Sequence, residues 1–223
     1  MMEHKRLTLF AGHYGSGKTN IAVNYAVALA KEGKKVCIAD LDIVNPYFRT
    51  KDSAEELEKQ GITLISSRYA NTNVDLPSIP AESYRLVQDK SIHGVIDLGG
   101  DDRGAYALGR FADAIRAEGD YRMAFVINCH RPLTSTVEDT VEIMKEIEAA
   151  SHLQFTCIVN NSNIGSETTP GTVLDSVAYA EGVSRVTGLP IWLYTAEKSV
   201  AEGIEGLPVL PLTLQKKYFD LTI

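Results

Sequence analysis

A glycine-rich loop between an apolar run and a helical pattern is the strongest chemical signal in this chain. The run LTLFA is followed by a full match to G-x-x-x-x-G-K-[ST]. Glycines let backbone N–H groups turn inward around phosphates, and the following helix adds the positive end of its dipole. The lysine of the motif reaches the β- and γ-phosphates, and the hydroxyl of the serine or threonine ligates Mg²⁺. The residues expected to bind a nucleotide here are Gly12, His13, Tyr14, Gly15, Ser16, Gly17, Lys18, Thr19 and Asn20.

Carboxylates follow two further apolar runs. The stretch VCIADLD contains Asp40 and Asp42, and GVIDLGG places Asp97 before two glycines. The carboxyl ends of parallel strands share one edge of a sheet, so these side chains are expected near the phosphates. One carboxylate can hold Mg²⁺ through water and another can orient an attacking water. The alternatives are a plain polar strand end for Asp40 and Asp42, and a functional pair Asp101–Asp102 in place of Asp97.

Apolar runs alternate with helical patterns along the chain, which is the rhythm of a parallel sheet covered on both faces. The expected fold is α/β, a three-layer P-loop NTPase in one domain (1–223), with a mostly parallel central sheet of about seven strands flanked by helices. The predicted strands are 7–11, 35–40, 63–66, 94–98, 123–128, 155–160 and 190–194. The predicted helices are 18–32, 105–118, 135–150 and 172–186. The first is expected to end at Gly33, and the third to begin with a capping box from Ser135 to Glu138.

Bulk properties limit the partners. Twenty-nine acidic against 22 basic residues give a net charge of −7, which disfavours binding to nucleic acid or to an anionic membrane. The apolar run in MMEHKRLTLF is too short for a signal peptide, and there is no apolar stretch of about 18 residues, so neither a signal peptide nor a membrane span is expected. Its three cysteines are scattered, so a disulfide framework or zinc site is not expected, and at least two should be buried small hydrophobes. A cytoplasmic location is expected.

The order of these motifs resembles the MinD/ParA/CobQ-type nucleotide-binding family, whose phosphate loop is a deviant Walker A motif. The resemblance rests on G-x-x-x-x-G-K-T, on A-x-x-L-A-x-x-G-K-K-V-x-x-x-D-x-D and on the strand ending in Asp97, and it is strongest over the first half of the chain. It implies that Lys18 and Thr19 contact phosphate and Mg²⁺, and that Asp42 positions the hydrolytic water. Asp40 would then lie near the metal, and Asp97 would be the Walker B residue.

The same resemblance extends to the nucleotide base. The run CIVNNSNIG is similar to the family's strand that ends with an adenine-contacting asparagine, which implies that Asn161 contacts the base. Its amide offers a donor and an acceptor to a purine edge. Asn160 is the second choice, and two ordinary turn residues are the alternative.

One position departs from the family pattern. Many deviant-loop members carry a second lysine just after the first glycine, and it reaches the partner's phosphates across a nucleotide-sandwich dimer; here that position is His13. A neutral imidazole brings no fixed positive charge at pH 7, so slow hydrolysis or another cation is expected. Arg103 is a candidate for that cation, against the simpler interpretation of an exposed loop arginine.

Several functions fit these motifs. The leading interpretation is a slow Mg·ATPase that cycles between ATP and ADP and acts as a nucleotide-dependent switch for an unknown protein partner, with a nucleotide-dependent homodimer as an option. The alternative is an ATP-dependent synthetase of the CobQ or dethiobiotin-synthetase type, which activates a carboxylate and which the histidine favours. A small-molecule kinase and a non-catalytic nucleotide-dependent scaffold rank lower.

Overall fold

The computed structural model describes residues 4–41, 54–66, 81–99 and 102–214. The strands are β1 (Leu7–Ala11), β2 (Val36–Leu41), β3 (Thr63–Ser66), β4 (His93–Leu98), β5 (Tyr121–Ile127), β6 (Cys157–Asn160), β7 (Ile191–Glu197) and β8 (Val209–Leu212). The α-helices are α1 (Lys18–Lys31), α2 (Ala54–Lys59), α3 (Arg85–Gln88), α4 (Asp102–Gly109), α5 (Ala112–Glu118), α6 (Val137–Ser151), α7 (Pro170–Asp175), α8 (Val177–Thr187) and α9 (Lys198–Ala201). Short 3₁₀ turns are η2 (Ala81–Tyr84), η3 (Pro132–Thr134) and η4 (Gly165–Glu167).

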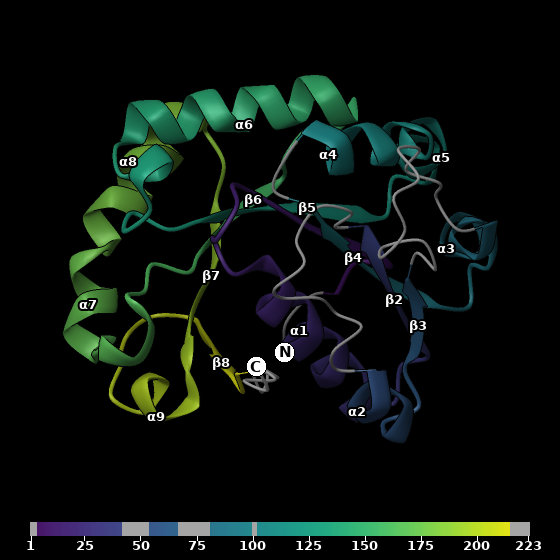
Figure 1. Cartoon of the computed structure of the whole chain (residues 1–223), viewed down its shortest axis with the longest axis horizontal. Coiled ribbons are helices and arrows are strands. Elements are labelled where there is room, and N and C mark those ends of the chain that lie inside the picture. Colours follow the sequence, from purple (N-terminus) through teal and green to yellow (C-terminus); the bar gives the residue numbers. More distant parts are fainter. Residues whose placement is uncertain (1–3, 42–53, 67–80, 100–101, 215–223) are drawn as a thin grey trace, which may run out of the picture.

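All the described strands join one parallel sheet in the order β3-β2-β4-β1-β5-β6-β7-β8 (Figure 1). The expected α/β fold with a parallel sheet is thereby confirmed. The strand order reverses at β1, whose neighbours are β4 on one side and β5 on the other. In open α/β sheets ligands bind outside the carboxyl ends of the strands at such a reversal. The glycine-rich loop (residues 12–19) begins at that point.

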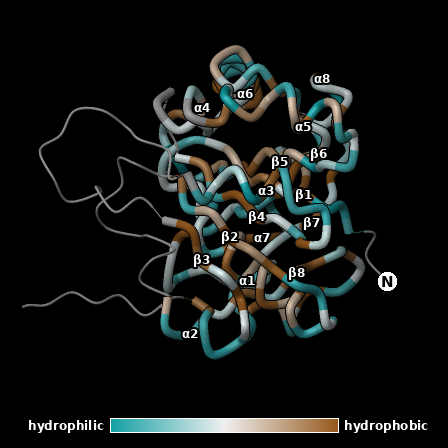
Figure 2. Tube along the Cα trace, turned by 90° about the vertical axis from the view of Figure 1, so that its right-hand side faces the viewer, coloured by the Kyte–Doolittle hydropathy of each residue, from teal (hydrophilic) through white to brown (hydrophobic). Residues whose placement is uncertain are grey.

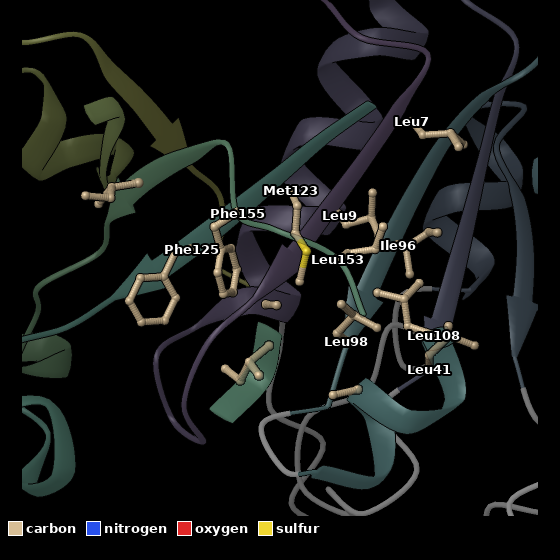
Figure 3. Close-up of a cluster of buried hydrophobic side chains, with 14 of the residues drawn as sticks. Leu7, Leu9, Leu41, Ile96, Leu98, Leu108, Met123, Phe125, Leu153 and Phe155 are labelled. Carbon is tan, nitrogen blue, oxygen red and sulfur yellow. The ribbon is translucent and has the colours of Figure 1, made fainter. Parts of the chain in front are cut away.

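Helices cover both faces of the sheet, with α1 and α2 on one face and α4, α6 and α8 on the other (Figure 1). On the face of the sheet that α1 covers, the helix packs against alternate strand residues, including Phe10, Ile38 and Val95. The opposite face uses the intervening residues, such as Leu9 and Ile96, against α4, α5 and α6. Figure 3 shows that second cluster, and Figure 2 shows the hydrophobic strands between more hydrophilic outer helices. Burial on both faces explains why the strands read as continuous apolar runs.

One strand was missed by the sequence-based prediction. The segment VLPL forms β8 at the edge of the sheet and pairs with β7, so the sheet has eight described strands rather than about seven. Proline cannot donate to a strand ladder, so a proline within a short run argues against a strand. Pro211 is tolerated because an edge strand has pairing partners on one side only, and its side chain is exposed.

The predicted helix boundaries were wrong at three places. The segment 105–118 is two helices, α4 and α5, which meet at a turn where the Phe111 amide donates to the Leu108 carbonyl. The segment 172–186 is likewise divided at Ser176 into α7 and α8. Helix α6 is capped by Thr136, whose side chain accepts from the Asp139 amide, rather than by Ser135. Apolar spacing of 3.6 residues continues across such breaks, so the pattern did not reveal them.

A buried ion pair ties the amino-terminal edge of the sheet together. The Arg6 guanidinium pairs with Glu118 and also donates to the backbone carbonyls of Leu86 at 2.8 Å and Ile92 at 3.2 Å. Lys90 contacts the same carboxylate at 2.8 Å. Burial alone would raise the pKa of Glu118, but the hydrogen bonds and charges of Arg6 and Lys90 outweigh it and hold that pKa below its usual value.

Arg6→Met is expected to lower the free energy of unfolding by about 3 kcal/mol, because it leaves a buried carboxylate short of its main partner. A folded-state pKa below the unfolded one stabilises the fold above the unfolded pKa, about 4.3, and that contribution is lost as the pH falls through the folded value. Urea unfolding at pH 7, 5 and 4 should therefore show a steeper acid loss in the wild type than in the variant. Arg116→Met is the control, since Arg116 pairs with an exposed Asp113 and such pairs contribute below about 1 kcal/mol. Equal losses in both variants would contradict this account.

None of the helices in the described ranges is long and apolar enough to span a membrane. The three cysteines are all free. Cys37 and Cys157 are buried, and burial raises the pKa of each thiol to about 11, so both are unreactive core residues, as the sequence predicts.

Candidate functional site

The glycine-rich loop follows β1 directly and ends where α1 begins. Gly17 precedes α1 with a φ of 92°, and a Cβ there would lie 2.2 Å from the Asn161 amide nitrogen. Gly12 has a φ of 154°, and a Cβ there would lie 2.3 Å from the Val126 carbonyl oxygen on β5. No side chain fits either place without displacing its neighbour. The loop therefore needs these glycines because the backbone of β5 and the Asn161 side chain lie directly against it, in addition to the space that a phosphate requires.

The side chains of the loop divide into buried and exposed ones. Ser16, Lys18 and Thr19 are buried, whereas Tyr14 is exposed on the outside of the loop. The Lys18 ammonium donates to the His13 carbonyl at 3.1 Å, and the Ser16 amide donates to the same carbonyl at 3.1 Å. The loop is thus closed on itself around one carbonyl, with its lysine held beside its own backbone. The His13 imidazole is half-buried, with Nδ1 3.0 Å from the Tyr14 carbonyl oxygen.

The Ser16 hydroxyl is buried and has no hydrogen-bond partner among the described residues. A buried hydroxyl without a hydrogen-bond partner destabilises a folded protein, so its presence indicates a polar partner that is not part of the described chain. It lies inside the loop that the sequence assigns to phosphate. A ligand oxygen or an ordered water would satisfy it.

Two buried hydrogen bonds of one side chain connect the loop to strand β7. The Asn161 amide nitrogen donates to the Ser16 carbonyl at 2.7 Å, and its amide oxygen accepts from the Thr195 hydroxyl on β7 at 2.6 Å. Asn161 is 5% exposed. Its amide retains one N–H and one lone pair beyond these bonds. The amide of Asn160 is directed elsewhere, donating to the Ser176 hydroxyl at 2.8 Å and accepting from Ser162.

Two acidic residues lie at the same level of neighbouring strands. Asp40 on β2 pairs in register with Asp97 on β4, and Asp97 pairs with Phe10 on β1. Side chains alternate along strands, and the residues two positions before them, Ile38 and Val95, pack on α1. Both carboxylates therefore face the layer of α1, the helix that the loop introduces. They are 7% and 1% exposed.

These residues form a donor set suited to Mg²⁺. Adjacent parallel strands are about 4.8 Å apart, so the two buried carboxylates are on neighbouring backbones, and like charges on such neighbours favour a cation between or beside them. Magnesium prefers oxygen ligands and keeps several waters, so one or two carboxylates with a threonine hydroxyl are sufficient. Within the described ranges no cluster of three or more histidine, cysteine, aspartate or glutamate side chains is placed to hold a metal. A water-rich Mg²⁺ site fits this chain better than an all-protein cage.

The turn after β5 also reaches the loop, although no motif in the sequence marks it. The buried Asn128 fixes this turn: its side-chain oxygen accepts from the His130 amide at 3.0 Å, and its carbonyl accepts from the Thr134 hydroxyl at 2.8 Å. The Arg131 Nε atom donates to the Gly15 carbonyl at 2.9 Å. The contact joins residues 116 positions apart, so no local pattern in the sequence indicated it.

Some predicted residues lie beyond what the structure describes. Asp42 and Asp101 lie outside the described residues, and the side chains of Asp102 and Arg103, which begin α4, are not described either. Asn20 is half-buried in the first turn of α1. Within the described ranges, the loop, the two strand-end aspartates and Asn161 all lie at the carboxyl ends of the strands.

The parallel sheet with its loop between β1 and α1 defines a P-loop nucleotide-binding protein. A family model described as the CobQ/CobB/MinD/ParA nucleotide binding domain matches residues 7–185, so the chain belongs to that family. Curated proteins gave no match to this sequence.

Solved structures share the fold at low sequence identity. The cell division protein FtsY of Thermotoga maritima is 19% identical, with a TM-score of 0.55 over 85% of this chain and 60% of that one. FtsY of Mycoplasma mycoides is 18% identical, with a TM-score of 0.53 over 85% of this chain and 60% of that one. The signal recognition particle 54 kDa protein of Aeropyrum pernix, solved in complex with GDP, is 20% identical, with a TM-score of 0.52 over 86% of this chain and 41% of that one. This chain spans three fifths or less of the length of these proteins.

Proposed function

We propose that this chain binds Mg·ATP, hydrolyses it slowly and acts as a nucleotide-dependent switch for a protein partner. The observation that carries the proposal is the register pair of Asp40 and Asp97, both buried and both facing the layer of α1, beside a closed loop that contains Lys18 and Thr19. Two neighbouring buried carboxylates next to a lysine-bearing anion loop suit a metal–phosphate complex better than either ion alone.

The proposed roles follow from the chemistry of each group. The backbone N–H groups of residues 12–19 and the Lys18 ammonium bind the phosphates, and the Ser16 hydroxyl, which has no partner among the described residues, gains an acceptor. Thr19, Asp40 and Asp97 hold Mg²⁺, directly or through water. The ion neutralises charge on the phosphates. Asp42, outside the described residues, is proposed to position the attacking water.

Slow hydrolysis is expected because the loop contains a histidine where many family members have a second lysine. His13 is half-buried and turned toward the Tyr14 carbonyl, and a neutral imidazole adds no fixed charge to the transition state. One charged group aimed at transferring phosphate contributes 10³-fold or more, on the order of 4 kcal/mol, in related chemistry. The proposed switch therefore remains in its triphosphate state for long periods.

The choice of ATP over GTP is proposed from Asn161, whose amide keeps one donor and one acceptor for a base. The GDP bound to the Aeropyrum pernix protein makes guanine the natural competitor to test. Equilibrium binding of Mg·ATP and Mg·GTP is expected to favour ATP, and the preference should shrink in Asn161→Ala. A preference for GTP would contradict the assignment of the base. A cytoplasmic location is proposed with the same function, in keeping with three free cysteines.

Light-scattering mass in solution tests the switch. We expect a larger particle with a Mg-bound non-hydrolysable ATP analogue than with Mg·ADP, because a nucleotide-sandwich dimer would pair the loops of two copies and Tyr14 on this loop is exposed. The control is Lys18→Ala, which should give one mass in both conditions. An unchanged mass in the wild type would count against a nucleotide-dependent homodimer and direct the search to a different protein partner.

A carboxylate-activating synthetase is the second candidate, favoured by His13 because synthetase relatives share the loop and a second lysine is not required in all of them. In that reaction ATP phosphorylates a bound carboxylate before ring closure or amide formation. The two functions differ in substrate: a carboxylic acid that raises ATP turnover at least tenfold would favour the synthetase. No stimulation across a panel of mono- and dicarboxylic acids would leave the switch as the better account.

A further inference from the structure

Arg131 is a charged residue that touches the glycine-rich loop from outside the nucleotide motifs. Its Nε atom donates to the Gly15 carbonyl at 2.9 Å, and it lies 3.5 Å from where a Cβ of Gly15 would be. Gly15 is the middle glycine of the loop and has a φ of 77°. A Cβ at position 15 would be in ordinary van der Waals contact with the guanidinium, so the arginine lies directly against this part of the loop.

The two terminal nitrogens of Arg131 have no hydrogen-bond partner among the described residues, and no described carboxylate pairs with this side chain. The contrast with Arg6 is direct, because Arg6 pairs with Glu118 and several carbonyls. An arginine carries five N–H donors in a planar fork, and within the part of the chain that the structure describes Arg131 uses one of them. The remaining donors are available to an anion.

The backbone around Arg131 holds it at the loop. Arg131 precedes Pro132 and has an extended conformation, φ −107° and ψ 137°, which is the range that a following proline imposes. Its amide donates to the Asn128 carbonyl at 3.2 Å, and its carbonyl accepts from the Thr134 amide at 3.0 Å. The turn is therefore hydrogen-bonded on both sides of the arginine, and the guanidinium projects from a fixed base.

The positive charge of Arg131 would also offset an excess of negative charge at the site. A nucleoside triphosphate carries several negative charges, and Asp40 and Asp97 add two more buried carboxylates in the same region. Lys18 is the cation within the loop motif, and His13 supplies no fixed charge. One lysine and one Mg²⁺ do not balance the negative charge of the phosphates and the two carboxylates. A guanidinium on the loop would reduce the negative charge that remains.

We propose that Arg131 is a phosphate-binding residue, which supplies from the same chain the second positive charge that His13 does not provide. The inference rests on the proposed binding of Mg·ATP and adds a residue to it. The Nε atom anchors the fork on the Gly15 carbonyl, and the terminal nitrogens bind the phosphate chain of the nucleotide. Because the contribution is one of charge, it grows with the number of phosphates and weakens with salt.

Titration calorimetry with AMP, Mg·ADP and Mg·ATP at 50 mM and 300 mM salt tests this role in four variants. Arg131→Gln removes the charge but keeps an amide donor, and Arg131→Lys keeps the charge. Arg185→Gln is the matched control, because Arg185 is an exposed arginine on α8. Lys18→Ala tests the phosphate loop itself. We expect Arg131→Gln to lose about tenfold in Mg·ATP affinity at low salt, less for Mg·ADP and nothing for AMP, with a reduced salt dependence.

Arg131→Lys should retain most of the affinity, and without nucleotide the melting temperature should fall by no more than about 4 °C in either variant, which is the loss of one hydrogen bond to the Gly15 carbonyl. Equal loss in Arg131→Gln and Arg131→Lys with an unchanged salt dependence would overturn the proposal and make Arg131 a brace for the loop. Wild-type affinity in Arg131→Gln, with binding lost in Lys18→Ala, would overturn the inference alone. Wild-type affinity in Lys18→Ala would overturn the proposed function together with the inference.

Discussion

Lys18→Ala is expected to weaken Mg·ATP binding by about 100-fold or more, which corresponds to about 2.7 kcal/mol. Removing one partner of a desolvated charge pair costs about 2 to 5 kcal/mol, and Lys18 is 5% exposed. Its ammonium donates to the His13 carbonyl, a contact within the loop that bound phosphate would replace or share. The charge of Lys18 is thus held within the loop.

Equilibrium binding to Mg·ATP, with Lys198→Ala as control, measures this effect. Lys198 begins α9 and its side chain is exposed, so its removal alters net charge by the same amount without touching the loop. We expect the control to bind like the wild type. Affinity that falls equally in both variants would mean that Lys18 acts through net charge alone, and unchanged affinity in Lys18→Ala would remove the phosphate assignment.

Gly17→Ala is expected to damage both the fold of the loop and its ligand binding. The residue has a φ of 92°, where a non-glycine residue costs about 1 to 2 kcal/mol, and the new methyl group would lie 2.2 Å from the Asn161 amide nitrogen. Displacing that amide also breaks its bond to the Ser16 carbonyl, worth about 1 kcal/mol. The free energy of unfolding should fall by about 2 to 3 kcal/mol, and Mg·ATP binding should be lost.

Urea unfolding followed by the fluorescence of Trp192, the single tryptophan, provides the measurement, since its ring packs against Phe10 and Tyr25 in the core. The double variant Gly17→Ala/Asn161→Ala separates the two causes. Removing the amide relieves the collision, so Asn161→Ala should cost less in the Gly17→Ala background than in the wild type. Additive losses would show that Asn161 and Gly17 do not press on each other in solution.

Local patterns predicted the elements well where a single signal dominated. The strand 7–11, the loop and the helix ending at Gly33, which has a φ of 80°, were confirmed because the signals are consecutive in sequence. The division of 105–118 into α4 and α5 was not predicted, since Leu108, Phe111 and Ile115 stay on the buried side across the break. Strand β8 was missed because it is stabilised by pairing with β7, and nothing in its own four residues indicates that pairing.

The candidate site shows the same division between local and distant information. The proximity of Asp40 to Asp97 followed from a general rule about strand ends, although their in-register pairing depends on β2 and β4 being neighbours. The contacts of Arg131 with Gly15 and of Thr195 with Asn161 join segments far apart in the chain, and only the folded sheet brings them together. Sequence thus located the motif, and structure added the residues that support it.

The dependence of ATP affinity on Mg²⁺, in the wild type and in Asp97→Asn, is the most direct test of the central claim that this sheet edge holds a metal–nucleotide complex. Calorimetric titration with ATP, in Mg²⁺ and in excess EDTA, measures it. The account predicts that Mg²⁺ tightens wild-type binding at least tenfold, about 1.4 kcal/mol, and that most of this gain disappears in Asp97→Asn. Wild-type protein that binds ATP equally well with and without Mg²⁺, or does not bind it at all, would contradict the claim.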